Sequence, residues 1–340
     1  MNKLYEGFTS IVYNWSKIKI NRYDLLAQGE YNQNYIFLNP IDSKKYVLRV
    51  NQGSQIGLEN QIKYEFNALK YMQKNQKKLR TPRVYYCDDS RKYIDKGVLI
   101  MEYIEGDYID YDKTSINSIV ECLADIHNIN TSKADGIFRK SAGARDMIVE
   151  CDCMFSKYDL NKISHNKHKD LFNKGIYEKI SNYVKIIKKM YDENNCKYMI
   201  NDVSIINTDL NSTNFLVHDN YVKLIDWEKP CIGDSAQDLG HFLAPTTTYW
   251  KTDKIYNSLE IHNIIKSYEN YTKSKYGIVI QDYEDRVLFY LKLNCLRGIT
   301  WCSMALMDYY GNRDDKKIYN ETTAIKLKEY IYNIEELLVK

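Results

Sequence analysis

The first quarter of the chain has short apolar runs, a pattern that predicts mostly β-strands. Residues 23–39 place apolar stretches on both sides of a polar turn that contains a glycine, and residues 46–50 alternate after a Pro/Asp/Ser turn. Residues 59–73 have helical spacing instead. Their apolar positions are Ile62, Phe66, Leu69 and Met72. Two further strands are expected within 81–89 and 97–106.

After Gly106, where the last of these strands is expected to end, the pattern becomes that of helices. Residues 115–130 begin with a candidate N-cap serine and repeat apolar residues three and four apart, and residues 176–192 are similar. Two short strands are expected at 215–225, and helices dominate from there to the end of the chain. A sheet followed by helices predicts an α+β fold with a boundary near residue 105.

The composition is that of an ordinary globular protein and argues against several functional classes. Of 340 residues, 44% are apolar and 27% charged, and the net charge of +3 is scattered, which disfavours nucleic acid as a partner. No run of about 18 apolar residues occurs, so no membrane span is expected, and the N-terminus does not resemble a secretory signal. The eight cysteines form no C-x-x-C pair, so we expect reduced thiols in a cytoplasmic protein, without a disulfide framework or zinc site.

Three polar residues at the ends of the second expected hairpin are the best candidates for chemistry. Phe215 to Val217 and Tyr221 to Ile225 flank the letters HDN, a three-residue turn, so antiparallel pairing places Asn214 beside Asp226. Asp209, five residues before Asn214, can reach the same space. Amide and carboxylate oxygens suit Mg²⁺, and a further carboxylate could deprotonate an attacking hydroxyl, which favours phosphoryl transfer. Taken singly, each residue is more typical of a turn or a strand-end cap.

The residues around these three resemble the catalytic segment of the aminoglycoside phosphotransferases and choline kinases, relatives of the protein kinases. The matching pattern is D-x-x-x-x-N, a hairpin and IDWE, continued by GDSAQDLGHFL. Similar segments follow the family's order over residues 20–245: GEYNQNYIF, YVLRV, YEFNAL, LIMEYIEG and LADIHNI. The resemblance implies a bilobal protein-kinase-like fold. A small antiparallel-sheet lobe over residues 1–105 would cover a nucleotide, and a larger, mainly helical lobe over 106–340 would carry the chemistry.

The resemblance also implies roles for single residues. Asp209 would be the catalytic base, and Asn214 and Asp226 would bind Mg²⁺. ATP, with GTP left open, would be held by residues of the family's nucleotide-binding segments: Gly29, Asn32, Arg49, Glu65, Glu102 and Ile104. Asp234 and Asp238 are expected to be structural, fixing the loop of Asp209 and the start of the next helix.

Within that nucleotide set, each position has its own expected contact. Gly29 and Asn32 match the loop that covers the nucleotide. Arg49 would contact the ATP phosphates and pair with Glu65, while backbone groups around Glu102 to Ile104 would hold the adenine.

Two departures from the family pattern leave an alternative open. The usual His two residues before the base is Asn207 here, and Arg49 stands where protein kinases have Lys. The leading hypothesis is transfer of the γ-phosphoryl group of ATP to a hydroxyl of a small polar molecule. The alternative is an inactive nucleotide-binding regulatory module of the same fold. The absence of D-F-G and A-P-E segments argues against a protein kinase.

The acceptor is less readable from the sequence. An amino alcohol, an aminoglycoside, a sugar or an amino acid would each fit the resemblance, and the oligomeric state is open. Candidate lining residues are Tyr249, Trp250, Trp301, Asp308, Tyr309 and Tyr310. A cationic acceptor could bind such a set, although aromatic residues at helical spacing are more typical of a core. Glu228 could face the acceptor or solvent, and His127 and His241 are expected to be packing residues.

Overall fold

The computed structural model of the protein describes residues 3–29, 31–158, 171–198, 203–310 and 321–338, and it divides the chain into two compact units. Unit 1 consists of Met1–Arg139 and Asn214–Ile232, and unit 2 of Lys140–Thr213 and Gly233–Lys340. Asn214 and Asp226 therefore belong to unit 1, together with the N-terminal sheet, whereas Asp209 belongs to unit 2.

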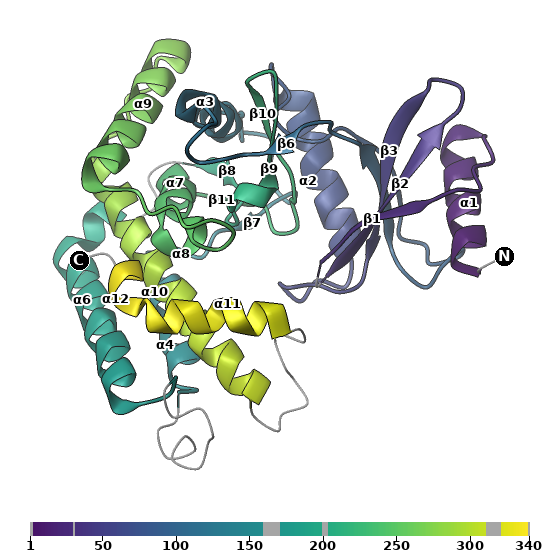
Figure 1. Ribbon diagram of the computed structural model, residues 1–340. Helices are drawn as coiled ribbons and strands as arrows, with labels where there is room; N and C mark the ends of the chain where they lie inside the picture. Colours follow the sequence, from purple (N-terminus) through teal and green to yellow (C-terminus); the bar gives the residue numbers. More distant parts are fainter. Residues whose placement is uncertain (1–2, 30, 159–170, 199–202, 311–320, 339–340) are drawn as a thin grey trace. The chain divides into compact units, whose positions relative to one another are not determined.

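Unit 1 is built on an antiparallel five-stranded sheet with the strand order β1-β2-β3-β5-β4 (Figure 1). The strands are β1 (Asp24–Gln28), β2 (Asn32–Asn39), β3 (Lys44–Asn51), β4 (Val84–Asp88) and β5 (Val98–Glu102). All five lie where the sequence predicts strands. The last one is shorter than expected, because β5 ends at Glu102 rather than at Gly106.

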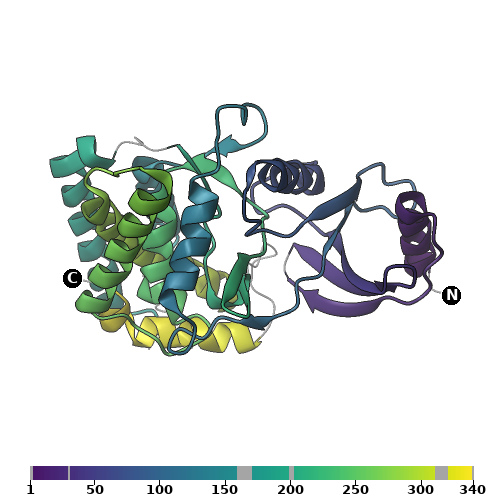
Figure 2. The same ribbon diagram turned by 90° about the horizontal axis from the view of Figure 1, so that it is seen from above.

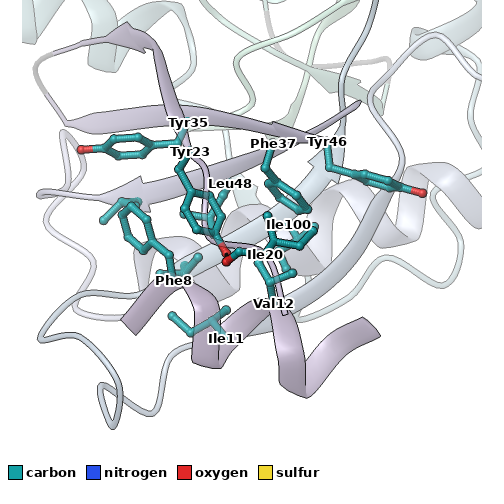
Figure 3. Packing of buried hydrophobic residues seen from close by; sticks show 12 residues of the cluster. Phe8, Ile11, Val12, Ile20, Tyr23, Tyr35, Phe37, Tyr46, Leu48 and Ile100 are labelled. Atoms are coloured by element: carbon teal, nitrogen blue, oxygen red, sulfur yellow. Dashed lines mark hydrogen bonds between the residues drawn. The ribbon is translucent and has the colours of Figure 1, made fainter. Parts of the chain in front are cut away.

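The N-terminal segment is a helix, α1 (Lys3–Ser16), so the expectation of mostly strands is wrong there. This helix packs on one face of the sheet and forms a core with alternate residues of β2 and β3, as Figure 3 shows. Its buried side chains Ile11 and Val12 follow the buried Phe8 by three and four residues. That helical spacing is the signal in the sequence that identifies the segment.

Helix α2 (Gln61–Asn75) covers the opposite face of the sheet (Figures 1 and 2), close to the helix predicted over 59–73. Side chains alternate between the two faces of a strand. Leu48 and Val50 of β3 therefore point into the core with α1, and Arg49 between them points toward α2. A cation is in this way buried between the sheet and a helix.

The expected hairpin is formed by β9 (Phe215–His218) and β10 (Tyr221–Leu224), and β9 also pairs with β6 (Asp107–Tyr108). The prediction of a three-residue turn is wrong, because His218 is part of β9 and only Asp219 and Asn220 form the turn. Both have positive φ, of 48° and 61°, as a type I′ turn requires. Next to β6, Gly106 has a φ of +152°, and a Cβ there would lie 2.7 Å from the carbonyl oxygen of Val217. Glycine is therefore required at this close approach.

Helix α3 (Ile116–His127) completes unit 1 and packs against β10. The candidate cap Ser115 occupies the N-cap position, but its side chain makes no capping hydrogen bond. The buried guanidinium of Arg80 joins the parts of this region: it pairs with Asp125 of α3 at 2.8 Å and donates to the carbonyl oxygen of Val222 of β10 at 3.2 Å. The hairpin is therefore held by β6 next to β9 and by Arg80 and α3 next to β10.

Unit 2 is mainly helical, and the long helix α10 (Tyr283–Tyr310) is its centre (Figure 1). Helices α4 (Ala144–Phe155), α6 (Lys174–Tyr198), α7 (Ser235–Leu243), α8 (Pro245–Thr248), α9 (Ser258–Tyr276) and α11 (Glu321–Tyr332) pack on it, and α12 (Ile334–Leu337) follows. The remaining short strands are β7 (Arg139–Lys140), β8 (Ser204–Ile206) and β11 (Cys231–Gly233). Among the described residues, no helix is both long enough and apolar enough to span a membrane.

Candidate active site

Arg49 is the centre of a buried charge cluster within unit 1. Only 3% of this residue is exposed. Its Nε atom donates to Oε2 of Glu65 at 3.1 Å, and Glu65, on α2, is 1% exposed. The structure therefore contains the ion pair between a strand cation and a helix carboxylate that the sequence predicts. Removing one partner of such a pair is costly, because the other charge stays out of water.

Two carboxylates from the segment after β10 complete the cluster. The Nη2 atom of Arg49 donates to Oδ1 of Asp226 at 2.6 Å and to Oε1 of Glu228 at 2.9 Å. Asp226 has a φ of +59°, a left-handed conformation that is uncommon outside glycine. The buried indole of Trp227 secures this turn, because its Nε1 donates to the carbonyl oxygen of Leu224 at 2.9 Å. The letters IDWE thus form a tight turn that presents two carboxylates to one guanidinium.

Asn214 lies at the start of the same hairpin, at the end of the 3₁₀ turn η1 (Ser212–Asn214). The residue is buried, and its carbonyl oxygen accepts a hydrogen bond from the N–H of Ile225 at 2.7 Å. This bond extends the pairing beyond Phe215 and Leu224. The predicted approach of position 214 to positions 224–226 is therefore confirmed.

The cluster carries more negative than positive charge, since three carboxylates share one guanidinium. Burial raises the pKa of Glu65 to about 7, with Arg49 opposing the rise and Asp226 and Glu228 adding to it. Burial and the nearby Asp226 likewise raise the pKa of Glu228. Burial alone would lower the pKa of Arg49, but the three carboxylates raise it, so the guanidinium stays charged.

The donor atoms in this place suit a hard divalent cation. Asn214 and Asp226 offer an amide oxygen and a carboxylate oxygen, and a divalent cation would neutralise the excess negative charge. Within the described part of the chain, no group of three or more His, Cys, Asp or Glu side chains is arranged to hold a metal. A Mg²⁺ site with two protein ligands is compatible with that finding, because Mg²⁺ keeps several waters and takes phosphate oxygens.

The turn before β2 is tied to the same cluster. The N–H of Gly29 donates to the carbonyl oxygen of Asn32 at 2.9 Å, which closes a tight turn. The buried side chain of Asn32 donates from Nδ2 to Oε1 of Glu228 at 2.5 Å. From α2, Gln61 donates through Nε2 to the carbonyl oxygen of Glu228 at 2.5 Å. The predicted nucleotide loop and the predicted metal segment are therefore joined through Glu228.

At the end of β5, the side chain of Glu102 already has partners. Its Oε1 accepts from Nζ of Lys223 at 2.8 Å, and its Oε2 accepts from the backbone N–H of Arg83 at 3.0 Å. By contrast, no hydrogen bond to another described residue involves the backbone of Ile104. A ligand beside this segment would thus meet backbone groups rather than the Glu102 carboxylate.

Within unit 2, the loop that carries Asp209 is held by side chains on α7. The carboxylate of Asp238 accepts from the backbone N–H groups of Asn207 and Thr208, each at 2.8 Å. Oδ1 of Asn207 accepts from the N–H of Asp209 at 3.0 Å, so Asn207 supports the loop through its own side chain. Nδ1 of His241 accepts from the N–H of Leu210 at 3.1 Å. The His241 ring is therefore a packing and positioning group, as predicted.

Asp234 has the structural position that the sequence predicts. It is the N-cap of α7, where Oδ1 accepts from the N–H of Ala236 at 2.9 Å. The same buried carboxylate accepts two hydrogen bonds from Arg286 of α10, at 2.6 and 2.9 Å. The start of α7, and with it Asp238, is in this way anchored to the central helix.

Comparison with known proteins places the chain in a family. A family model described as DUF1679, "Uncharacterized oxidoreductase dhs-27", matches residues 58–274, which is more than half of the chain. The chain belongs to the DUF1679 family. No curated protein matches this DUF1679 chain.

Solved structures similar to the DUF1679 chain are phosphotransferases and kinases by name. Spectinomycin phosphotransferase APH(9)-Ia, in complex with ADP and spectinomycin, has 12% identity and a TM-score of 0.62, covering 97% of this chain and 98% of the other. APH(2″)-IIa in a ternary complex with streptomycin and ATP has 16% identity and a TM-score of 0.61, covering 98% and 97%. Choline kinase from Cryptosporidium parvum Iowa II has 13% identity and a TM-score of 0.60, covering 93% and 89%. These likenesses show the protein-kinase-like α+β fold that the sequence predicts.

Two residues of the cluster were not assigned from the sequence. The sequence leaves Glu228 between acceptor and solvent, and no motif in it points to Gln61. Both act through partners more than 160 positions away in the chain: Asn32 is 196 residues from Glu228, and Gln61 is 167 residues from it. For Glu228 the local signal is its place in IDWE, and Gln61 has no such motif.

Several of the candidate acceptor residues pack against other side chains of unit 2. Tyr249 packs against Tyr330 of α11, and the ammonium of Lys326 lies over its ring, 3.9 Å from the centroid. Trp250 also contacts Tyr330. Asp308 is buried on α10, and Tyr309 packs on Tyr310. The face of Tyr249 is thus already covered by a cation of the chain itself.

Proposed function

We propose that the protein is an ATP- and Mg²⁺-dependent phosphotransferase that moves the γ-phosphoryl group to a hydroxyl of a small polar molecule. The observation that carries this proposal is the cluster in which Arg49, paired with Glu65, also contacts Asp226. A buried cation next to a carboxylate at a strand end provides both a phosphate-binding charge and a metal-binding oxygen. Its occurrence in a protein-kinase-like fold favours nucleotide chemistry over a merely structural role.

Each candidate residue has a defined task in this proposal. Asp209 accepts the proton of the attacking hydroxyl, and its loop is held still by Asn207 and Asp238. Asn214 and Asp226 supply the metal ligands. A bound Mg²⁺ would neutralise charge on the phosphate oxygens, and Arg49 would add a fixed positive charge beside them. Catalysis would then depend on the position of the attacking hydroxyl and on neutralisation of the charge on the phosphate oxygens.

The nucleotide would be held by backbone and polar groups. The closed turn of Gly29 and Asn32 would cover the phosphates, with Glu65 keeping Arg49 in place. Backbone groups around Glu102 and Ile104 would hold the base, because the Glu102 carboxylate is engaged by Lys223. ATP is the proposed donor, and GTP is the comparison that tests the base preference.

The contacts of the two unusual residues favour turnover over an inactive module. Asn207 reaches the N–H of Asp209, so the loop has a support where the family pattern has His. Arg49 keeps its charge and its partner Glu65. Asn207 in place of His and Arg49 in place of Lys therefore both keep the contact that phosphoryl transfer needs at that position.

The description of the family as an oxidoreductase is not favoured for this chain. The sequence contains no G-x-G-x-x-G, the glycine pattern of a dinucleotide-binding turn. Two of the similar proteins named above are complexed with a nucleotide and an antibiotic, one with ATP and streptomycin and the other with ADP and spectinomycin. We therefore propose an acceptor of the same broad chemistry, a polar compound with a free hydroxyl, such as an aminoglycoside, an amino alcohol or a sugar.

A turnover assay tests the proposal. The purified protein is given ATP and Mg²⁺ with a panel of aminoglycosides, choline, ethanolamine, sugars and hydroxy amino acids, and ADP release and phosphorylated acceptor are measured. Asp209→Ala serves as the inactive control. Acceptor-dependent ADP release by the wild type alone would support the enzyme, whereas nucleotide binding with no turnover on any acceptor would favour the inactive module.

A further inference from the structure

Glu228 joins the two parts of unit 1 that the proposed function assigns to nucleotide and metal. A single oxygen of its carboxylate, Oε1, accepts from Nδ2 of Asn32 at 2.5 Å and from Nη2 of Arg49 at 2.9 Å. Its carbonyl oxygen accepts from Gln61 on α2 at 2.5 Å. The side chain is 21% exposed, so it is held by the protein rather than directed into solvent.

The guanidinium of Arg49 has few donors left for a phosphate. Its Nε bonds to Glu65, and its Nη2 bonds to both Asp226 and Glu228. Nη1 makes one long contact, 3.4 Å from Oδ1 of Asn34. Because Nη2 carries two protons, both are committed while Asp226 and Glu228 are bound. A phosphate could gain an Nη2 proton only if one of these carboxylates withdrew.

Asp226 is the carboxylate that a divalent cation would engage, whereas Glu228 also holds Asn32. We propose that Glu228 is a positioning residue that makes nucleotide binding dependent on the metal. This inference rests on the proposed nucleotide and metal binding. With a cation on Asp226, an Nη2 proton of Arg49 becomes available to phosphate, while Glu228 keeps Arg49 and Asn32 in place. Without a cation, three carboxylates around one guanidinium repel the polyphosphate.

Removing the Glu228 carboxylate should therefore have opposite effects in the two conditions. In the absence of metal, one negative charge fewer lies beside the phosphates, so nucleotide binding should strengthen. In the presence of metal, Arg49 and Asn32 lose their common anchor, so nucleotide binding should weaken. A residue that merely stabilises the fold would weaken binding by the same factor in both conditions.

The experiment measures ADP binding to the full-length protein by isothermal titration calorimetry, once with excess Mg²⁺ and once with EDTA. The variants are Glu228→Ala and Glu228→Gln, and the controls are Glu6→Ala and Glu6→Gln at an exposed position on α1. Circular dichroism and thermal unfolding show that each variant is folded. ADP is used because it reports binding without turnover.

We expect Mg²⁺ to strengthen ADP binding to the wild type, and Glu228→Ala to reduce that enhancement about tenfold, within the usual range of couplings between two ligands. Glu228→Gln keeps an acceptor oxygen and should retain part of the enhancement, and the Glu6 variants should retain all of it. An unchanged enhancement in Glu228→Ala, or none in the wild type despite ADP binding, overturns this inference but leaves the proposed function standing. No ADP binding to the wild type in either condition overturns the proposed function itself.

Discussion

Asp238 accepts a hydrogen bond from the backbone N–H of Thr208 at 2.8 Å, and Thr208 has a φ of +69°. A β-branched residue is strained in that conformation, and such strain persists only where surrounding contacts impose it. The same Asp238 carboxylate binds the N–H of Asn207. The buried side chain of Asp238 therefore helps to hold the loop of Asp209 in an unfavourable backbone conformation, and under the proposed function we expect it to position the base.

Asp238→Ala should lower both stability and turnover. Two backbone N–H groups would lose their acceptor, which should reduce the free energy of unfolding by about 2 kcal/mol. The loop would relax, so kcat should fall, while ADP affinity, which depends on unit 1, should change little. Urea unfolding and steady-state kinetics measure the two effects, with Asp253→Ala at an exposed position of unit 2 as the control. An unaltered kcat in a folded Asp238→Ala variant would contradict the positioning role.

Asp209→Ala should abolish most turnover without harming the fold. The residue is half-buried, and its side chain accepts from Nδ2 of Asn211 at 3.2 Å. Loss of a general base slows a reaction by about 10²–10⁴-fold, and ADP binding should persist. Single-turnover kinetics with the cognate acceptor measure the effect. Near-full phosphotransfer by the variant would show that Asp209 is not the base.

Asp226→Ala should reduce turnover to a similar extent, by about 10²-fold or more, because a positioned charge contributes several kcal/mol to the barrier. In contrast to Asp209→Ala, this variant should also lose the Mg²⁺ dependence of ADP binding. Calorimetry with and without Mg²⁺ separates the two variants. If Asp226→Ala bound ADP with the wild-type response to Mg²⁺, the metal would have to be held elsewhere.

Much of this site could be predicted because its signals are local. The hairpin that brings Asn214 toward Asp226 depends on two short strands and a turn, all within 13 residues, Asn214 to Asp226. The pairing of Arg49 with Glu65 is implied by the resemblance of YVLRV and YEFNAL to the family's segments, while periodicity predicts only the strand and the helix that carry them. Glu228 could not be assigned in this way, because its partner Asn32 is 196 residues away and neither residue type implies the other.

The errors in the fold have equally physical causes. The expectation of strands fails at α1, where the helical spacing of Phe8, Ile11 and Val12 is a short signal within a single helix. The predicted hairpin turn is one residue too long, because His218 is compatible with either a strand or a loop. The positive φ of Asp219 and Asn220 settles the two-residue turn, and such backbone angles are only weakly encoded by residue type.

The buried pair of Asp234 and Arg286 should be a major source of stability in unit 2. Asp234→Ala would leave a guanidinium without its partner in the protein interior, which should reduce the free energy of unfolding by about 3–5 kcal/mol. Asp234→Ser keeps an oxygen for the N–H of Ala236 and should recover about 1 kcal/mol of that loss, the usual value of a helix cap. Urea unfolding measures both variants.

A double-mutant cycle isolates the ion pair itself. Arg286→Met combined with Asp234→Ala should be less destabilising than the sum of the single changes, because no unpaired charge then remains buried. Simple additivity in this cycle would mean that the two side chains contribute independently, contrary to the two hydrogen bonds between them.

Glu65 should make stability fall with rising pH. Burial raises its pKa from 4.5 to about 7, so the folded protein keeps this proton over a range where the unfolded chain has lost it. The stabilising contribution is complete below pH 4.5 and is lost as the pH rises through 7, a difference of roughly 3 kcal/mol. The window applies to the protein without metal or nucleotide, since either ligand changes the charge around Arg49.

Glu65→Gln tests this directly, because glutamine resembles the protonated carboxyl in shape and charge. The free energies of unfolding of wild type and variant should be close at pH 5. By pH 8, the free energy of unfolding of the variant should exceed that of the wild type by up to roughly 3 kcal/mol relative to pH 5. Urea unfolding at pH 5, 6, 7 and 8 in EDTA measures the change, and Glu6→Gln should follow the wild type throughout. Parallel curves for wild type and Glu65→Gln would mean that Glu65 is ionised across this range and that Arg49 outweighs the burial of its carboxylate.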